Sequence, residues 1–192
     1  RRSSDLPNYE CWWNMPALPK FNTENPEVRE FLFSVAEYWL SRGIDGWRLD
    51  VPNEINDDSF WQEFRLRVKN INKDAYIVGE IWDNPSRWLQ GDQFDGVMNY
   101  RLRKLLLETF LSQTNDFQEK FSAFSKELVN VCADNFGISL NLLSSHDTRR
   151  LMSQPNSSIK KMKMLWTLLF FLPGVPCIYY GEEIAMEGGK DP

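Results

Sequence analysis

Three mostly apolar runs of this chain each end in a carboxylate, and this feature most constrains the fold. The runs span residues 43–50, 76–80 and 140–147, and they end at Asp50, Glu80 and Asp147. Each run has the composition of a buried strand, which predicts an acid at the tip of three strands. The intervals of 30 and 67 residues between the acids suit one and two strand–helix units of a parallel barrel or sheet, whose strand tips meet on one face. Acids gathered there repel one another and raise one another's pKa, so their clustering indicates a chemical role.

Helical and strand patterns alternate about five times along the chain. The first helix is predicted to begin at Pro26 with Asn25 as its N-cap, and its apolar residues recur at Val28, Phe31, Leu32, Val35, Ala36 and Trp39. Further helices are expected over residues 60–71, 85–89, 102–110, 117–131 and 159–172, and strands over residues 44–51, 75–82, 96–100, 138–143 and 175–180. This alternation is typical of an α/β fold with a parallel sheet. A closed eight-stranded barrel typically needs about 250 residues, so a chain of 192 residues is either part of a barrel or an open sheet.

The composition narrows the class of partner and the compartment. A net charge of −5 argues against nucleic acid and fits a neutral, soluble substrate. The cysteines Cys11, Cys132 and Cys177 are too widely spaced for a disulfide framework or a metal-ligand pattern. Buried, reduced thiols are therefore expected, which favours a cytoplasmic location. The apolar run 164–172 is too short to span a bilayer, so no membrane partner is expected.

The side chains at the end of the first acidic run suggest a nucleophile. Strand alternation places Arg48 and Asp50 on the same face. A guanidinium beside Asp50 would keep that carboxylate ionised and oriented, as a nucleophile requires. A structural ion pair between Arg48 and Asp50 explains the same spacing equally well.

The other two acids also have two interpretations each. Glu80 lies between an apolar strand and Trp82, and apolar surroundings raise the pKa of a carboxyl group as a general acid needs. Asp147 follows His146, the only histidine of the chain. Taken alone, each acid is more often a helix cap or a loop residue. Taken together, the strand-tip acids favour a site, and an acid paired with a nucleophile suggests glycoside hydrolysis.

Three motifs resemble conserved regions of the α-amylase family, glycoside hydrolase family 13. They are Trp-Arg-Leu-Asp at residues 47–50, Gly-Glu-Ile-Trp at residues 79–82 and Ser-His-Asp at residues 145–147. Runs at residues 18–22, 91–95, 97–100 and 173–183 resemble further parts of the same domain. With Val-Pro-Asn-Glu at residues 51–54, the combination is most similar to the neopullulanase, cyclomaltodextrinase and maltogenic amylase group.

The resemblance implies a retaining α-glucan hydrolase that cleaves α-1,4 bonds of cyclomaltodextrin, pullulan or maltodextrins by double displacement. It implies that Asp50 is the nucleophile, that Glu80 is the acid and base, and that Asp147 binds sugar hydroxyls and favours the distorted ring. The remaining substrate-binding residues that it implies are Arg48, His146, Asn53, Glu54 and Trp82. An exo-acting α-glucosidase, or a non-catalytic scaffold of the same fold, is the alternative.

The resemblance also predicts which part of the fold is present. Residues 1–192 correspond to strands four to eight of a (β/α)8 TIM barrel, without strands one to three, the inserted domain or a C-terminal β-domain. The family's first conserved region, a strand that ends in Asn-His, is absent, and Pro52 stands where the group has Ala. We therefore expect a fragment of a larger enzyme, with little activity alone. No cofactor is expected in this chain, any calcium is expected in the missing part, and a homodimeric parent is compatible with the resemblance.

Overall fold

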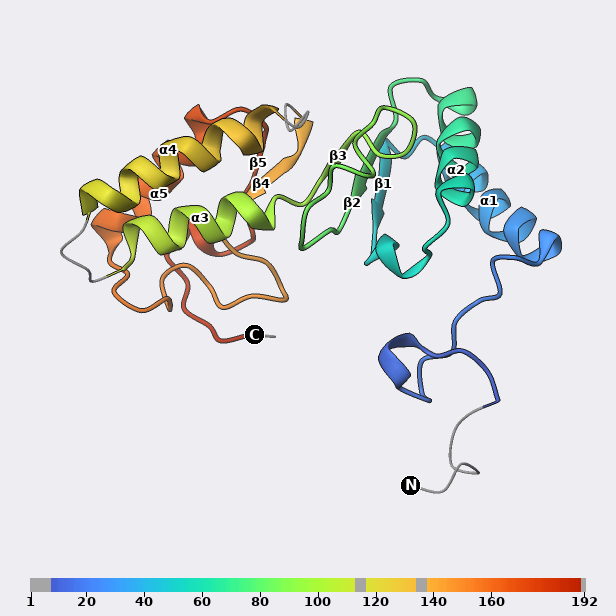
Figure 1. The fold of residues 1–192 in the computed structure, drawn as a ribbon, viewed down its shortest axis with the longest axis horizontal. Coiled ribbons are helices and arrows are strands. Elements are labelled where there is room, and N and C mark those ends of the chain that lie inside the picture. Colours follow the sequence, from blue (N-terminus) through green and yellow to red (C-terminus); the bar gives the residue numbers. More distant parts are fainter. Residues whose placement is uncertain (1–7, 113–116, 134–137, 191–192) are drawn as a thin grey trace. The chain divides into compact units, whose positions relative to one another are not determined.

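The computed structural model describes residues 8–112, 117–133 and 138–190 (Figure 1). The chain divides into two compact units. Unit 1 comprises Arg1–Gly46 and Pro52–Ala75, and unit 2 comprises Trp47–Val51 and Tyr76–Pro192. The chain thus leaves unit 1 for one short segment that carries the first acidic motif. It then returns to unit 1 before it completes unit 2.

Unit 1 is built on two helices, α1 (Pro26–Leu40) and α2 (Asp58–Ile71). The predicted start of α1 is confirmed, because the side chain of Asn25 accepts hydrogen bonds from two backbone N–H groups of the first turn and Pro26 follows it. Asp57 caps α2 in the same way. A short 3-10 helix, η2 (Trp12–Asn14), precedes α1, and a second, η3 (Pro52–Glu54), precedes α2.

The two helices of unit 1 share an aromatic core. Phe33 of α1 meets Phe60 of α2 with ring centroids 5.0 Å apart, and Ala36 is also buried. By contrast, Phe31 and Trp39 are 59% and 48% exposed, although they belong to the predicted apolar set. The reason is that apolar residues cover most of the circumference of α1, whereas α2 covers one side.

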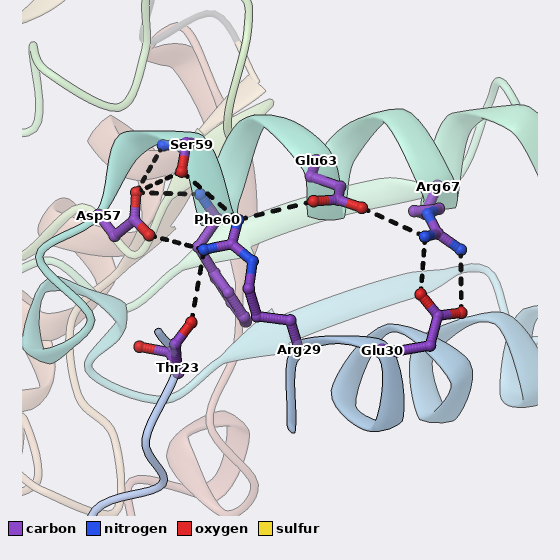
Figure 2. A network of polar contacts seen from close by, with 8 residues as sticks. All are labelled: Thr23, Arg29, Glu30, Asp57, Ser59, Phe60, Glu63 and Arg67. Atoms are coloured by element: carbon purple, nitrogen blue, oxygen red, sulfur yellow. Dashed lines mark hydrogen bonds and ion pairs between the residues drawn. The ribbon is translucent and has the colours of Figure 1, made fainter. Parts of the chain in front are cut away.

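Charged side chains connect the same two helices, as Figure 2 shows. Arg67 of α2 pairs with Glu30 at 2.9 Å and Glu37 at 3.2 Å, both on α1, and with Glu63 at 3.2 Å. Arg29 of α1 pairs with the capping residue Asp57 at 2.7 Å and lies 3.6 Å from Glu63. These two arginines and their carboxylates are called the helix-pair network below.

Unit 2 contains parallel strand pairs. A three-stranded sheet has the order β1 (Gly46–Leu49), β2 (Tyr76–Gly79) and β3 (Gly96–Val97), and β2 and β3 are parallel. The strands β4 (Leu140–Leu142) and β5 (Val175–Cys177) form a second parallel pair. A parallel bridge between Met98 and Leu140 connects the two sheets.

Three helices supply the main core of unit 2. They are α3 (Tyr100–Phe110), α4 (Phe117–Ala133) and α5 (Ile159–Phe171), and α3 contacts both of the others. Leu106 and Leu165 are fully buried in this core, together with Leu143, which follows β4. A last 3-10 helix, η5 (Glu182–Ile184), follows β5.

The predicted α/β class and the predicted parallel pairing are confirmed. The helix predicted at residues 85–89 was wrong, because a single turn closed by Trp88 N–H on the Pro85 carbonyl (2.9 Å) occupies this stretch. Tyr100 was placed in a strand but begins α3, since the Asn99 side chain caps the helix there. Residues 113–116, between the helices predicted over 102–110 and 117–131, lie outside the described residues. The assignment to strands four to eight stays a prediction.

Two further sequence expectations concern thiols and membranes. Cys11 and Cys177 are free thiols, as predicted, but each is only partly buried. The side chain of Cys132 lies outside the described residues. Within the described ranges, every helix is too short or too polar to cross a membrane.

Candidate active site

Arg48 connects two of the strand-tip acids within unit 2. Its Nη1 bonds Oδ1 of Asp50, and its Nη2 lies 3.0 Å from Oε1 of Glu80. The backbone brings the acids together, because Glu80 follows β2 directly and its N–H donates to the carbonyl of Leu49 in β1 at 2.9 Å. One guanidinium therefore contacts both carboxylates.

The two carboxylates have different environments. The side chain of Asp50 is 65% exposed, whereas that of Glu80 is 3% exposed. Burial raises the pKa of Glu80 above its usual range, and the negative charges of Asp50 and Asp147 raise it further. The Arg48 guanidinium and a backbone hydrogen bond oppose this increase in the pKa. The structure thus gives one acid contact with water and gives the other a reason to hold a proton.

The hydrogen bond to Glu80 comes from an unusual backbone position. Val51 N–H donates to Oε2 of Glu80 at 3.2 Å, and Val51 has a φ of +36°. A β-branched residue rarely adopts this left-handed region, and such strain concentrates at functional sites. Pro52 follows and is buried at the start of η3. Its ring fixes its φ, so the backbone is rigid directly after Val51.

Asp147 lies in the loop after β4, where its neighbours orient it. His146 Nε2 is 2.9 Å from Oδ2 of Asp147, and the Asp147 N–H donates to Oγ of Ser145 at 3.3 Å. Ser145 Oγ also lies 3.2 Å from the hydroxyl of Tyr100. Burial raises the pKa of Tyr100 to about 12, so this hydroxyl keeps its proton. Since the charge of Asp147 also acts on Glu80, the third acid belongs to the same cluster.

Two stacked aromatic rings, those of Trp82 and Tyr100, lie near these acids. The ring of Trp82, two residues after Glu80, stacks on Tyr100 with centroids 3.7 Å apart and planes 7° apart. Trp82 remains 43% exposed and lines a cavity of about 390 Å³ together with Asp83, Asn84 and one side of α3. Such a surface can hold the apolar face of a sugar ring while polar groups bind its hydroxyls.

The predicted site residues divide between the two units. Arg48, Asp50, Glu80, Trp82, His146 and Asp147 all lie in unit 2. Asn53 and Glu54 belong to unit 1, where Glu54 accepts a 3.1 Å hydrogen bond from the indole of Trp13 and Asn53 is exposed. The predicted roles of all eight residues remain predictions.

Sequence reasoning missed two contributors to this site. Tyr100 was assigned to a strand, and its contact with Ser145 joins positions 45 residues apart, so no local pattern shows it. Val51 was expected as the last residue of the strand over residues 44–51. Its Val-Pro sequence gave no signal for this conformation, because a residue before a proline favours extended backbone, whereas Val51 has a positive φ.

Comparison with known proteins gives a consistent result. A family model described as the alpha amylase catalytic domain matches residues 6–191. A cyclomaltodextrinase from a Bacillus species is 48% identical over 97% of this chain and 34% of its own length. Neopullulanase 2 from Thermoactinomyces vulgaris is 46% identical over 96% of the chain and 32% of its own, and an intracellular maltogenic amylase from Bacillus subtilis is 41% identical over the same shares.

A solved structure agrees with these relatives. The cyclic alpha-maltosyl-(1→6)-maltose hydrolase of Arthrobacter globiformis, in complex with maltose, superposes with a TM-score of 0.88 at 41% identity. The superposed region covers 99% of this chain and 43% of the hydrolase chain. The chain spans about a third of the length of the curated relatives that it matches. Because the family model matches nearly all of the chain, the resemblance seen in the sequence is confirmed: this chain belongs to the alpha-amylase family and matches its catalytic domain.

Proposed function

We propose that the full-length protein containing this chain is a retaining α-glucan hydrolase. The observation that carries the proposal is the Arg48 guanidinium that contacts both Asp50 and Glu80. Retaining glycosidases need one carboxylate that attacks the sugar and one carboxylic acid that protonates the leaving oxygen, about 5–5.5 Å apart. The exposed Asp50 and the buried Glu80, with its raised pKa, fit these two tasks.

In the first half of the reaction, protonated Glu80 gives its proton to the glycosidic oxygen as the bond to the sugar breaks. The carboxylate of Asp50 bonds to the anomeric carbon and forms a covalent glycosyl-enzyme. Arg48 holds Asp50 in place through its Nη1. The first sugar product, now carrying the proton from Glu80, leaves the site.

In the second half, Glu80 acts as a base. Its new carboxylate is stabilised by Nη2 of Arg48 at 3.0 Å and by the Val51 N–H at 3.2 Å. It takes a proton from a water molecule, the water oxygen bonds to the anomeric carbon, and the bond to Asp50 breaks. Glu80 is again protonated and Asp50 is again a carboxylate, so both residues regain their starting states.

The remaining residues bind the substrate in this proposal. Asp147 accepts hydrogen bonds from sugar hydroxyls and favours the distorted ring, and His146 beside it binds the same sugar. Trp82 offers its exposed ring on the leaving-group side. Asn53 and Glu54 tune the choice of substrate from the loop after the nucleophile.

The substrate class follows from the relatives. Their names specify cyclomaltodextrin, pullulan and a cyclic maltosyl-maltose, which all contain α-linked glucose. We propose α-1,4 cleavage of cyclomaltodextrin, pullulan or maltodextrins, with an exo-acting α-glucosidase as the second candidate. A cytoplasmic location is proposed because one relative is named an intracellular enzyme. We further propose that this chain binds no cofactor and that residues 1–192 alone have little or no activity. A homodimeric full-length protein also remains a proposal.

Product analysis of the full-length protein tests the function. Cyclomaltodextrin should be hydrolysed with release of the α-anomer, which proton NMR detects before mutarotation. Replacement D50N should reduce kcat at least about 10³-fold, because the covalent intermediate can no longer form. The matched control is D45N, a change at an exposed aspartate of unit 1. A β-anomeric first product, or full activity of D50N, would overturn the assignment.

A further inference from the structure

A fully buried acid outside the proposed chemistry lies behind the loop of Asp147. Glu182 begins η5 and is 1% exposed. Its Oε1 accepts a 2.5 Å hydrogen bond from Oγ of Ser144 and a 3.3 Å hydrogen bond from the N–H of Leu151. Ser144 and Leu151 lie on either side of Asp147 in the chain. A single carboxylate oxygen therefore accepts hydrogen bonds from both sides of the Asp147 loop.

The charge of Glu182 is compensated by an equally buried cation. Arg150 is 1% exposed, and its Nη1 lies 3.9 Å from Oε1 of Glu182 and donates to the Tyr180 carbonyl at 2.6 Å. The guanidinium carbon also lies 4.6 Å from the ring centroids of both Tyr179 and Tyr180. The segment after β5 is therefore tied to the segment after β4 by a buried ion pair, a hydrogen bond and two ring contacts.

Stability alone does not account for this arrangement. A buried ion pair can often be replaced by well-packed apolar residues without loss of stability, since desolvation consumes most of its attraction. Within the described residues, Oε2 of Glu182 and Nε of Arg150 have no hydrogen-bond partner, which makes the pair still more costly. The ion pair does hold Oε1 of Glu182 in a fixed position, where it accepts the hydrogen bond from the Ser144 hydroxyl.

Local hydrogen bonds extend this anchor to the acid itself. Ser145 follows the anchored residue, and its N–H donates to Oγ1 of Thr148 at 2.8 Å. Its Oγ in turn accepts the N–H of Asp147. Ser144, Ser145 and Asp147 thus each take part in a hydrogen bond that holds this part of the loop.

We propose that Glu182 is a positioning residue that holds the Asp147 loop through Ser144, with Arg150 compensating its charge. The inference rests on the proposed function, because it assigns Asp147 a place in the reaction. Glu182 touches no substrate in this account. It acts by keeping the Asp147 carboxylate where the distorted sugar needs it.

The test uses the full-length protein and the variant S144A, which removes the anchored hydroxyl and leaves the ion pair intact. The control is S157A, the same change at a hydroxyl with no partner among the described residues. S144A should lower kcat/KM on cyclomaltodextrin about tenfold relative to S157A. In a D147N background the same change should have no further effect, because the acid that it positions is already disabled.

A second measurement does not depend on activity. Hydrogen exchange of the amides of residues 145–148 should accelerate in S144A and remain unchanged in S157A. The conservative variant E182Q retains an acceptor for Ser144 and should keep at least a third of kcat/KM, whereas E182A should lose as much as S144A.

Three results would overturn the inference: kcat/KM of S144A within twofold of S157A, a tenfold loss that persists in D147N, or unchanged exchange. A full-length protein that has no glucan hydrolase activity but shows faster exchange in S144A would instead contradict the proposed function.

Discussion

Arginines pair with several carboxylates in both units, yet the acids behave differently. In the helix-pair network of unit 1, the side chains of Glu30 and Glu37 are 60% and 32% exposed, and the pKa of Asp57 lies below its usual range. A hydrogen bond from Ser59 is the main cause of that lowered pKa, and Arg29 adds to it. In unit 2 the pKa of Glu80 is raised although Arg48 contacts it, because burial outweighs the cation. Burial, more than the presence of an arginine, therefore decides in which direction the pKa of these acids moves.

The two acids also have opposite effects on stability as the pH changes. A carboxyl group with a lowered pKa, such as Asp57, stabilises the fold above its unfolded pKa of about 3.9, and this contribution is lost as the pH falls through the folded pKa. A carboxyl group with a raised pKa, such as Glu80, favours the fold most below its unfolded pKa of about 4.3. Its contribution is lost as the pH rises through the folded pKa.

Of the three changes that test this contrast between the units, E80Q should have the largest effect, since it removes the proton donor and keeps the shape of the side chain. In the full-length protein kcat on cyclomaltodextrin should fall about 10²–10⁴-fold. The melting temperature at pH 7 should rise, because burial disfavours the charged form that a glutamate favours in water at this pH, and a neutral amide carries no such penalty. Steady-state kinetics and calorimetry measure the two changes. E119Q, at an exposed glutamate of α4, is the control. Unchanged activity of E80Q would show that the buried acid is not the proton donor.

The next effect comes from R48M, which removes the cation shared by Asp50 and Glu80. We expect kcat/KM to fall about 10–100-fold as Asp50 loses its orientation. Since Arg48 lowers the pKa of Glu80, the alkaline limb of the pH–rate profile should move to higher pH. A full pH profile measures both, with R42M in unit 1 as the control. A limb that moves toward acid would contradict the stated balance between burial and charge.

The smallest effect is expected in unit 1, from D57A. The free energy of unfolding should decrease by about 1 kcal/mol at pH 7, because the N-cap of α2 is lost. The difference from the wild type should shrink as the pH falls below about 4, where the wild-type carboxylate also becomes protonated. Denaturant titrations at several pH values measure this, and D74A at an exposed aspartate is the control. A difference that grows in acid would reverse the sign assigned to Asp57.

Local chemistry made parts of this molecule predictable. Asn25 followed by Pro26 is sufficient to start a helix, because both residues act within one turn. Glu80 could be placed after a strand for a similar reason, since the apolar run before it is continuous. Arg48 and Asp50 share a strand face by simple alternation, and the structure shows the contact.

Contacts between distant segments were not predictable. The bonds from Tyr100 to Ser145 and from Ser144 to Glu182 join positions 45 and 38 residues apart. The positive φ of Val51 depends on the contacts around it and has no signature in strand periodicity. The exposed side of α1 was likewise hidden, because an apolar pattern shows which residues can be buried and leaves open which of them are.

That exposed side has a practical consequence for handling the protein. Phe31, Val35 and Trp39 of α1 form an exposed apolar stripe, in which Val35 is 37% exposed. Apolar patches of this kind drive colloidal self-association in a separately expressed domain. Residues 1–192 purified alone should therefore form reversible clusters whose size in light scattering grows with concentration. Replacing the stripe with lysines, rather than adding salt, would be the way to keep the isolated chain monodisperse.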